Sequence, residues 1–458
     1  MLKIVNPATD EVIANVPCDD VSSIAKKIAL ARKAQPAWAA QPLQTRIAAI
    51  KKFREQIENR REDLALILTN EMGKPITQSL NELNGLLPRL DFFIANAERV
   101  LASETVYDDP AQKIIERIAY EPLGVIANIS AWNYPYFVGS NVFIPALLLG
   151  NTVIYKPSEY ATLSGLQIAE MLHEAGIPND IFIGAIGGPE IGQELVLQKI
   201  DGVFFTGSFK TGCSIAERTA GKMIKTQLEL GGKDAIYVAD DVDIPSVAEQ
   251  VADGCFYNTG QSCCSVERLY VHERIYTQFL EAFVMVVKKF VIGDPVEPST
   301  YIGPLTRRQP HIKFLEDQIA DAKQKGASVL IGGKKMALPG HYFSPTVLVQ
   351  VSHEMKVMRE ETFGPLIGIM KVKNDTQAVH LINDTDYGLT AGVYTQDQAR
   401  AEHLLHQLDS GTVYWNCCDR VSPRLPWSGR HHSGIGATLG IEGMRSFLKP
   451  KAYHLYHK

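Results

Sequence analysis

The stretch VIANIS at residues 125–130, together with the segments that follow it, decides the fold class of this chain. Similar short runs of β-branched and apolar residues end in glycine, serine, proline or aspartate: NTVIYKPS (151–158), DIFIGAIGG (180–188), GVFFTGS (202–208) and DAIYVAD (234–240). Between them lie segments with helical spacing of apolar residues, among them TLSGLQIAEMLHEAGIPND (162–180). This alternation predicts an α/β fold with a parallel sheet, helices on its faces and ligands at the carboxyl ends of the strands.

The regions on either side of these segments differ from them in the spacing of apolar residues. Residues 21–38 and 46–73 show the apolar spacing typical of helices, whereas 106–122 is polar with an alternating pattern that favours strands. After Gly231 and Gly232 the strand-like and helix-like segments resume and indicate a second α/β domain. The tail at 446–458 has too little apolar bulk for a core of its own, so we expect it to dock on a neighbouring domain or subunit.

Composition narrows the class of protein. The 458 residues suffice for two or three domains, and the formal net charge of -5 provides no footprint for nucleic acid or an anionic membrane. No apolar run approaches the roughly 20 residues that span a bilayer, and the opening MLKIVNPATDEVIANV lacks a signal-peptide core. The seven cysteines have no regular spacing and do not make a disulfide framework. We therefore expect a reducing cytoplasm and no nucleic-acid or membrane partner.

Polar residues gather where the predicted strands end. AWNYP (131–135) follows the first strand, KPSE (156–159) the second, and TGSFKTG (206–212) a later one. Gly207 and Ser208 could open a helix and offer backbone N–H groups to a phosphate. The usual G-x-G-x-x-G fingerprint is absent, and taken one at a time these residues are equally explained as ordinary turns.

Two acidic motifs follow. In TQLELGGKD (226–234), Glu229 stands in an apolar strand before two glycines, either reaching solvent or held near neutrality by poor solvation, as a general base requires. In REETFGP (359–365), two acids and a phenylalanine precede a Gly-Pro turn, for which a purely structural reading also serves.

The pair Cys263 and Cys264 closes the run TGQSCC (259–264). No histidine or C-x-x-C spacing accompanies it, so we expect no metal site. A disulfide between neighbours would be strained, and buried filler is the main alternative for either thiol. Because the preceding Gly-Gln-Ser makes a poor core wall, a nucleophilic thiol in a turn fits better.

Seven motifs stand in order along the chain: AWNYP, KPSE, FTGSFKTG, LELGGK, GQSC, EETFGP and PWSGRHHSGIG (426–436). Together they resemble the NAD(P)-dependent aldehyde dehydrogenase superfamily over essentially the whole length. The resemblance implies a Rossmann-like NAD-binding domain (1–103 and 123–231) and an α/β catalytic domain (232–446). It also implies a small β oligomerisation element (104–122 and 447–458) and a homodimer or homotetramer.

In that family a cysteine attacks the aldehyde, and the motif match places this nucleophile at Cys263. The resemblance makes Asn133 the side-chain donor to the oxyanion and Glu229 the base that activates water against the thioester. Two rivals stay open: transfer of the acyl group to coenzyme A instead of water, and a catalytically silent member of the fold. A redox role for Cys264 is a further, secondary alternative.

The resemblance implies an NAD site. A carboxylate at Glu159 would bind a free ribose 2′-hydroxyl and repel a 2′-phosphate, which favours NAD over NADP. The expected cofactor contacts are Ser130, Trp132, Lys156, Ser158, Glu159, Gly188, Gly207, Ser208, Leu230, Glu361 and Phe363.

The substrate tunnel departs from the family pattern. Asn141 stands where relatives that bind a substrate carboxylate carry arginine, so that anchor is missing at this position. The expected lining favours an apolar or aromatic aldehyde, although Arg420 and Arg424 are candidates for guiding an anionic tail, with solvated loop residues an equal alternative. The expected tunnel residues are Tyr134, Val138, Asn141, Tyr257, Trp427 and Arg420.

Overall fold

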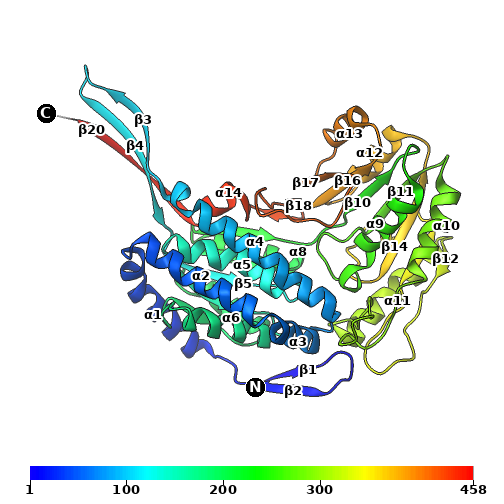
Figure 1. Ribbon diagram of the computed structural model, residues 1–458, viewed down its shortest axis with the longest axis horizontal. Coiled ribbons are helices and arrows are strands. Elements are labelled where there is room, and N and C mark those ends of the chain that lie inside the picture. The colour runs from blue at the N-terminus through cyan, green and yellow to red at the C-terminus, as the bar shows by residue number, and fades with distance from the viewer. Residues whose placement is uncertain (457–458) are drawn as a thin grey trace.

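The computed structural model describes residues 1–456 as two α/β lobes and a slender sheet that projects from the first lobe (Figure 1). The predicted fold class is confirmed, since both lobes are built on largely parallel sheets covered by helices. No helix in residues 1–456 is long and apolar enough to cross a membrane.

The first lobe contains a six-stranded sheet in the order β19-β9-β8-β5-β6-β7. Five of its strands are parallel, and β19 pairs antiparallel with the edge strand β9. Strand β5 is the first strand of this sheet in the sequence, and later strands are added on both sides of it. The carboxyl end of β5 is therefore a topological switch point, where α/β proteins bind ligands. The bounds are β5 Val125–Ile129, β6 Thr152–Lys156, β7 Phe182–Gly184, β8 Gly202–Thr206, β9 Lys225–Glu229 and β19 Gly434–Ile435.

Helices cover both faces of this sheet, and alternate strand residues face the two layers. Ile126, Val153 and Phe204 pack with α2 to α6, whereas Val125, Ile154 and Val203 pack with α1, α7 and α8. Helix α5 begins with Pro135, which is suited to a first helical position, and is buried almost all round between α4 and the sheet. The bounds are α1 Val21–Ala39, α2 Leu43–Asn59, α3 Arg61–Met72, α4 Ile76–Leu101, α5 Pro135–Leu148, α6 Thr162–Glu174, α7 Pro189–Leu197 and α8 Phe209–Ala220.

The second lobe contains a seven-stranded sheet in the order β12-β13-β14-β11-β10-β16-β17, in which only β12 is antiparallel to its neighbour. Its strands are β10 Ala235–Val238, β11 Arg268–His272, β12 Ser328–Ile331, β13 Thr346–Val349, β14 Leu366–Val372, β16 Thr390–Tyr394 and β17 Thr412–Trp415. Its helices are α9 Ile244–Phe256, η1 Tyr257–Gly260, α10 Tyr276–Val287, α11 Arg308–Gln324, η2 Lys356–Met358, α12 Asp375–Asn383 and α13 Gln398–Leu405, and a small ladder joins β15 Tyr387–Gly388 to β18 Arg430–His431.

Each lobe receives a segment from the opposite end of the chain. The N-terminal hairpin of β1 (Leu2–Val5) and β2 (Val12–Val16) reaches the second lobe, where the N–H of His341 donates to the carbonyl of Pro7 at 3.1 Å. Strand β19 and α14 (Gly440–Arg445) return to the first lobe, and Met444 and Phe447 are buried in its core. Residues 434–447 therefore pack outside the lobe to which the sequence boundary at 446 assigned most of them, because β9 offers them a free edge and an apolar surface.

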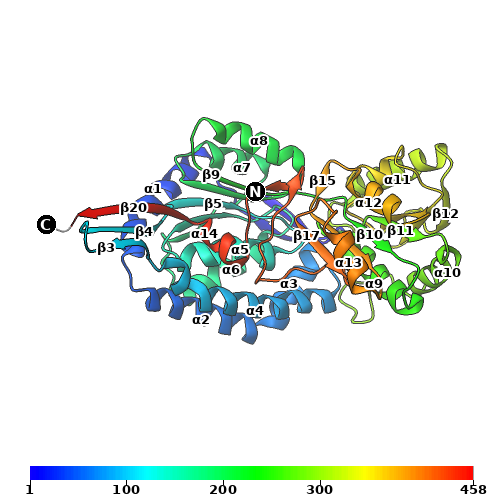
Figure 2. The same ribbon diagram turned by 90° about the horizontal axis from the view of Figure 1, so that it is seen from above.

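The projecting sheet is antiparallel, in the order β20-β4-β3, and carries the C-terminal end of the described chain away from the first lobe (Figures 1 and 2). It consists of β3 Glu104–Asp109, β4 Ile114–Pro122 and β20 Leu448–Tyr456. These strands cover both predicted segments of the β element, apart from residues 457–458, which lie outside the described residues.

Candidate functional site

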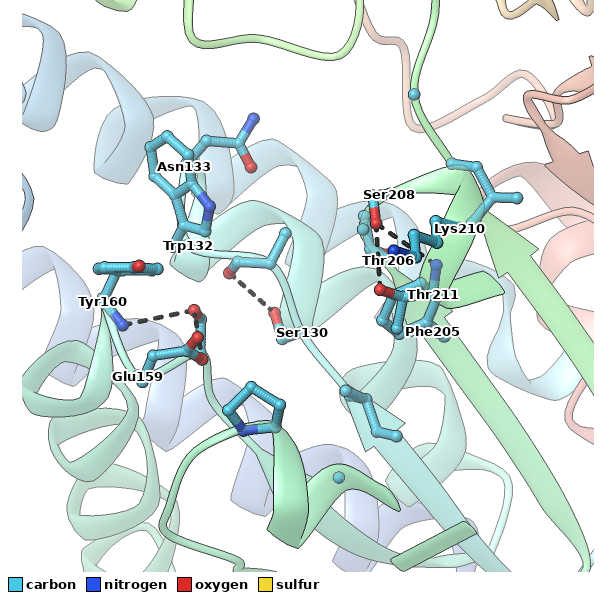
Figure 3. A pocket seen from close by; sticks show the side chains of 18 of the residues that line it. Ser130, Trp132, Asn133, Glu159, Tyr160, Phe205, Thr206, Ser208, Lys210 and Thr211 are labelled. Carbon is cyan, nitrogen blue, oxygen red and sulfur yellow. Dashed lines mark hydrogen bonds between the residues drawn. The ribbon is translucent and has the colours of Figure 1, made fainter. Parts of the chain in front are cut away.

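A cleft of about 840 Å³ lies at the carboxyl ends of β5, β6 and β8 and reaches the loop of Cys263. Figure 3 shows Trp132 and Glu159 on one side of it and Ser208, Lys210 and Thr211 on the other. The cleft brings together Asn133, Cys263 and every predicted cofactor residue except Gly188, namely Ser130, Trp132, Lys156, Ser158, Glu159, Gly207, Ser208, Leu230, Glu361 and Phe363.

Gly188 lies beside the cleft and does not line it. Its N–H donates to Oε1 of Glu190 at 3.0 Å, and a Cβ at this position would lie 2.6 Å from the same carboxylate. The side chain of Glu190 therefore covers Gly188, and the following residues Pro189 and Gly192 supply the wall instead.

The end of the cleft beside β8 is suited to phosphate. Helix α8 starts after its cap residue Ser208, whose Oγ accepts the N–H of Thr211 at 3.4 Å. A Cβ on Gly207 would lie 2.4 Å from the ring of Phe205, so only glycine fits without displacing that ring. The helix N-terminus thus presents backbone N–H groups and the positive end of its dipole to the cleft.

Lys156 and Glu159 form a polar corner at the end of β6. The Lys156 side chain is buried, its Nζ donates to the carbonyl of Pro157 at 3.1 Å, and it lies 3.8 Å from a carboxylate oxygen of Glu159. Burial lowers the pKa of Lys156, and the charge of Glu159 opposes that shift. A carboxylate beside an ammonium group is a suitable donor and acceptor pair for ribose hydroxyls. The α8 terminus and this corner together fit the phosphate and ribose groups of a nucleotide.

The opposite end of the cleft carries Glu361 and Phe363. Burial raises the pKa of Glu361 to about 8, with the charge of Glu267 adding to the effect. Phe363 adopts a left-handed backbone (φ 51°), which is unusual for a bulky residue. Glu267, which the sequence reasoning did not identify, anchors this turn because its carboxylate accepts the N–H groups of Thr362 and Phe363 at 2.7 and 2.8 Å.

The loop that carries the two adjacent cysteines follows a tight turn. Asn258, Thr259 and Gly260 all have positive φ (53°, 58° and 70°), so the chain bends sharply before the thiols. Cys263 is half-buried and lines the cleft, whereas Cys264 is buried and its Sγ donates to Oδ1 of Asp419 at 2.9 Å. The contact with Cys263, together with burial, raises the pKa of Cys264 well above its usual value. The two thiols therefore face different surroundings.

Asn133 is tied to the same loop. Its Nδ2 donates to the carbonyl of Gln261 at 3.1 Å, and Nδ2 of Asn258 donates to that carbonyl at 3.1 Å and to the carbonyl of Asn133 at 3.3 Å. A side-chain amide carries two N–H groups, so one donor of Asn133 remains beyond this bond. The arrangement holds a neutral donor beside Cys263, as stabilisation of an oxyanion requires.

Glu229 is buried at the end of β9 and does not line the cleft. Its Oε1 accepts hydrogen bonds from Oγ1 of Thr438 and from Nε2 of Gln227, the latter at 3.3 Å. Burial raises the pKa of Glu229 to about 7, while these hydrogen bonds and the charge of Arg89 hold it down. A carboxyl group with such a pKa can act as a base near neutral pH. Sequence reasoning missed Thr438 and Arg89, which lie far from Glu229 in the chain.

The predicted tunnel residues form a second group, and none of them lines the cleft. Tyr134 stacks on Phe137 with ring centres 6.0 Å apart, and Nζ of Lys74 lies 3.7 Å from the Tyr134 ring centre. The remaining members are half-buried Val138, Asn141 bonded to Arg89, Tyr257 bonded to Asn81, buried Trp427, and Arg420, whose guanidinium donates to the carbonyl of Asp419.

Asp419 is a further residue that the sequence reasoning did not single out. Burial raises its pKa to about 6, and its carboxylate accepts from both Cys264 and Ser262. Burial raises the pKa of Tyr134 well above its usual value, and the charge of Asp419 adds to that shift. In residues 1–456 no group of three or more His, Cys, Asp or Glu side chains is arranged to hold a metal ion.

Comparison with known proteins gives consistent matches over the whole chain. The model of the aldehyde dehydrogenase family matches residues 1–453. A chloroplastic aminoaldehyde dehydrogenase of Arabidopsis thaliana is 33% identical over 99% of this chain and 93% of its own. An NADP⁺ succinate-semialdehyde dehydrogenase of Deinococcus radiodurans is 33% identical over 98% of this chain and 93% of its own. The solved lactaldehyde dehydrogenase from Escherichia coli superimposes with a TM-score of 0.96 at 32% identity, covering 99% of this chain and 95% of the other.

Proposed function

The chain belongs to the aldehyde dehydrogenase family, and from this premise we propose that it oxidises an aldehyde to a carboxylic acid with NAD as the oxidant. The single observation that carries the proposal is the position of Cys263. Its half-buried thiol lines the cleft together with Asn133 and the residues that fit a dinucleotide.

In the first step Cys263 loses its proton to water and its sulfur attacks the aldehyde carbon, so that a carbon–sulfur bond forms, the carbonyl double bond breaks, and the oxygen takes the negative charge. The amide of Asn133, fixed by Gln261, and the backbone N–H of Cys263 stabilise this oxygen. Neutral donors suit the task because they stabilise developing charge without first acquiring a proton.

A nicotinamide dinucleotide bound in the cleft would supply the acceptor for the hydride that leaves the aldehyde carbon. Loss of that hydride restores the carbonyl and leaves a thioester on Cys263. Phe363 and Glu361 at this end of the cleft are the residues positioned to orient the nicotinamide and its ribose.

Glu229 completes the cycle by taking a proton from water, which attacks the thioester carbon and breaks the carbon–sulfur bond. The acid leaves, and Glu229 returns the proton to the Cys263 sulfur. Its pKa of about 7, raised by burial, suits a base at neutral pH. The side chain is bonded to Thr438 and Gln227, so we propose that it leaves one of these partners to reach the water.

NAD rather than NADP is proposed because Glu159 lines the ribose corner of the cleft. A carboxylate there would accept a hydrogen bond from a free 2′-hydroxyl and repel a phosphate. The related enzyme of Deinococcus radiodurans is named for NADP⁺, so the preference of this chain depends on its own Glu159.

The seven cysteines are all free, which supports a reducing compartment such as the cytoplasm.

We also propose that the projecting sheet joins subunits into a homodimer or homotetramer. Val106, Tyr107 and Tyr456 expose apolar surface on its strands, and β3 leaves a free edge. Light scattering should give a multiple of the 50.6 kDa chain for the wild type and a smaller assembly for Val106→Lys. A monomeric wild type would contradict this assignment.

The experiment that tests the function is a panel of aliphatic, aromatic, hydroxylated and carboxylated aldehydes with NAD, followed by NADH absorbance. Cys263→Ala should lower kcat/KM by about 10³-fold or more, because the covalent route is lost. Full activity of this variant would overturn the proposal.

Adding coenzyme A tests the acylating alternative: only free acid is expected. A silent member of the fold would oxidise no aldehyde.

A further inference from the structure

Three arginines within residues 1–456 are deeply buried, and two of them each make four hydrogen bonds within the fold. Arg46 and Arg268 are 5% and 2% exposed. The Arg46 guanidinium donates to the carbonyls of Trp38, Ala39, Gln41 and Leu148. Arg268 donates to three backbone carbonyls and to the hydroxyl of Tyr270. Both are structural, because each guanidinium is held by four hydrogen bonds within the protein.

Arg89 is as buried as Arg46, at 5% exposed, but is not satisfied in this way. Within residues 1–456 its guanidinium makes one hydrogen bond, from Nη1 to Oδ1 of Asn141 at 2.9 Å, and no ion pair. An arginine carries five N–H donors, so most of them have no partner. Nε and Nη2 are not among the fully enclosed polar atoms without a partner, which means that they still touch accessible space.

The acidic neighbours of Arg89 are committed elsewhere. Glu82 pairs with the buried ammonium of Lys74 and accepts the N–H groups of Tyr136 and Phe137 at the start of α5. Glu229 is bonded to Thr438 and Gln227. A buried cation without a paired anion is costly to the fold, so its retention indicates a counter-ion from outside the chain.

Arg89 also lies in the right place for a substrate contact. It projects from α4 onto α5, with its guanidinium carbon 4.0 Å from the ring centre of Phe137, which stacks on Tyr134. Burial lowers the pKa of Arg89 to about 10, and the charges of Glu82 and then of Glu229 oppose that shift. The guanidinium therefore contacts α5 at Phe137 and at Asn141, which is one of the predicted tunnel residues.

We propose that Arg89 binds a carboxylate at the far end of a short aldehyde while the aldehyde group reacts at Cys263, with Asn141 holding the guanidinium in place. This inference rests on the proposed function and deepens it by assigning the substrate class, an aldehyde that carries a second, anionic group. The planar guanidinium fork can make two parallel hydrogen bonds to a carboxylate.

The position of Arg89 changes the significance of Asn141. The absence of an arginine at position 141 pointed away from an anionic substrate, yet Asn141 accepts a hydrogen bond from an arginine supplied by the neighbouring helix. The cation is present at this place and comes from α4 instead of α5. Arg420, one of the two loop arginines considered above, has the acid Asp419 as its neighbour, and the charge of Asp419 raises the pKa of Arg420 against the effect of burial.

The test compares succinic semialdehyde with its uncharged methyl ester. For the wild type, kcat/KM for the acid should exceed that for the ester by about 10-fold or more, because only the acid carries the second charge. A wild type that uses the ester as well as the acid overturns the inference, whether or not any variant folds. A wild type that oxidises no aldehyde instead overturns the proposed function.

Variants then assign the preference to Arg89. Arg89→Gln should lower kcat/KM about 100-fold for the acid and no more than about 5-fold for the ester, while Arg89→Lys should retain part of the preference. An equal loss for both substrates would make Arg89 a residue of the fold or of general electrostatics and would overturn the inference. The inference also fails if Arg420→Gln, and not Arg89→Gln, removes the preference.

Discussion

The hydroxyl of Thr438 donates a hydrogen bond to Oε1 of Glu229, across 209 positions of sequence. The bond connects the end of β9 to the segment that returns from the second lobe, so the proposed base depends on a residue from the far end of the chain. Because hydrogen bonds to a carboxylate favour its charged form, Thr438 holds the pKa of Glu229 down against the effect of burial.

Replacing Thr438 should therefore shift the pH dependence of thioester hydrolysis. In Thr438→Val the pKa of Glu229 should rise above about 7, and the rise of the hydrolysis rate should move by about one unit to higher pH. The rate is measured by quenching acyl-enzyme at successive times over a range of pH. Thr438→Ser keeps the hydroxyl and should keep the wild-type profile; a shift to lower pH in Thr438→Val would contradict the role given to Thr438.

Cys264 should prove dispensable for turnover and important under oxidation. Cys264→Ser should retain kcat/KM within about 5-fold, since this thiol bonds to Asp419 and does not line the cleft. Because the two cysteines are adjacent, mild peroxide should inactivate the wild type and a later addition of thiol should restore its activity. Cys264→Ser should instead lose activity irreversibly, because Cys263 oxidises further. Equal recovery of both proteins would remove any protective role.

The cofactor preference should change when Glu159 loses its charge. Glu159→Gln should raise the ratio of kcat/KM with NADP to that with NAD by about 10-fold, because the repulsion of a 2′-phosphate is relieved. Glu159→Asp, which keeps the carboxylate, is the matched control. A wild-type enzyme that already prefers NADP would show that Glu159 does not set the choice.

The buried pair of Lys74 and Glu82 should matter for stability. Both side chains are fully enclosed, so Lys74→Met leaves the Glu82 carboxylate without its cation and should lower the free energy of unfolding by about 3–5 kcal/mol. Lys313→Ala breaks an exposed pair with Asp317 and should leave the free energy of unfolding nearly unchanged. Urea unfolding measures both. If the free energy of unfolding of Lys74→Met is no lower than that of Lys313→Ala, the buried pair stabilises the fold no more than the exposed pair does.

Sequence reasoning reached the features that are encoded locally. The parallel strands of the first lobe end in glycine, serine or proline turns, and chain topology brings those turns to one edge, so Ser130, Lys156 and Gly207 could be expected in one cleft. Residues that act across the fold had no local signal. Arg89 reads as an ordinary helical residue, and its isolation becomes visible only when the partners of neighbouring acids are known.

Boundaries between lobes were harder to predict for a related reason. Strand β19 has two residues, too few for any periodic pattern, and its pairing with β9 depends on the free edge of a distant sheet. Gly188 also shows that local sequence does not reveal which side chains cover a position. The resemblance assigned Gly188 to the cofactor, but the side chain of Glu190 covers it.

Because terminal segments are exchanged between the lobes, no single cut in the chain yields two fragments that each contain a complete lobe. A fragment ending near 231 would lack β19 and α14, exposing the edge of β9 and the core surface that Met444 and Phe447 cover. A fragment beginning there would lack the hairpin whose Pro7 carbonyl receives the His341 N–H. Because the other end of the polypeptide completes each lobe, we expect the first lobe to reach its final packing only after nearly the whole chain is synthesised.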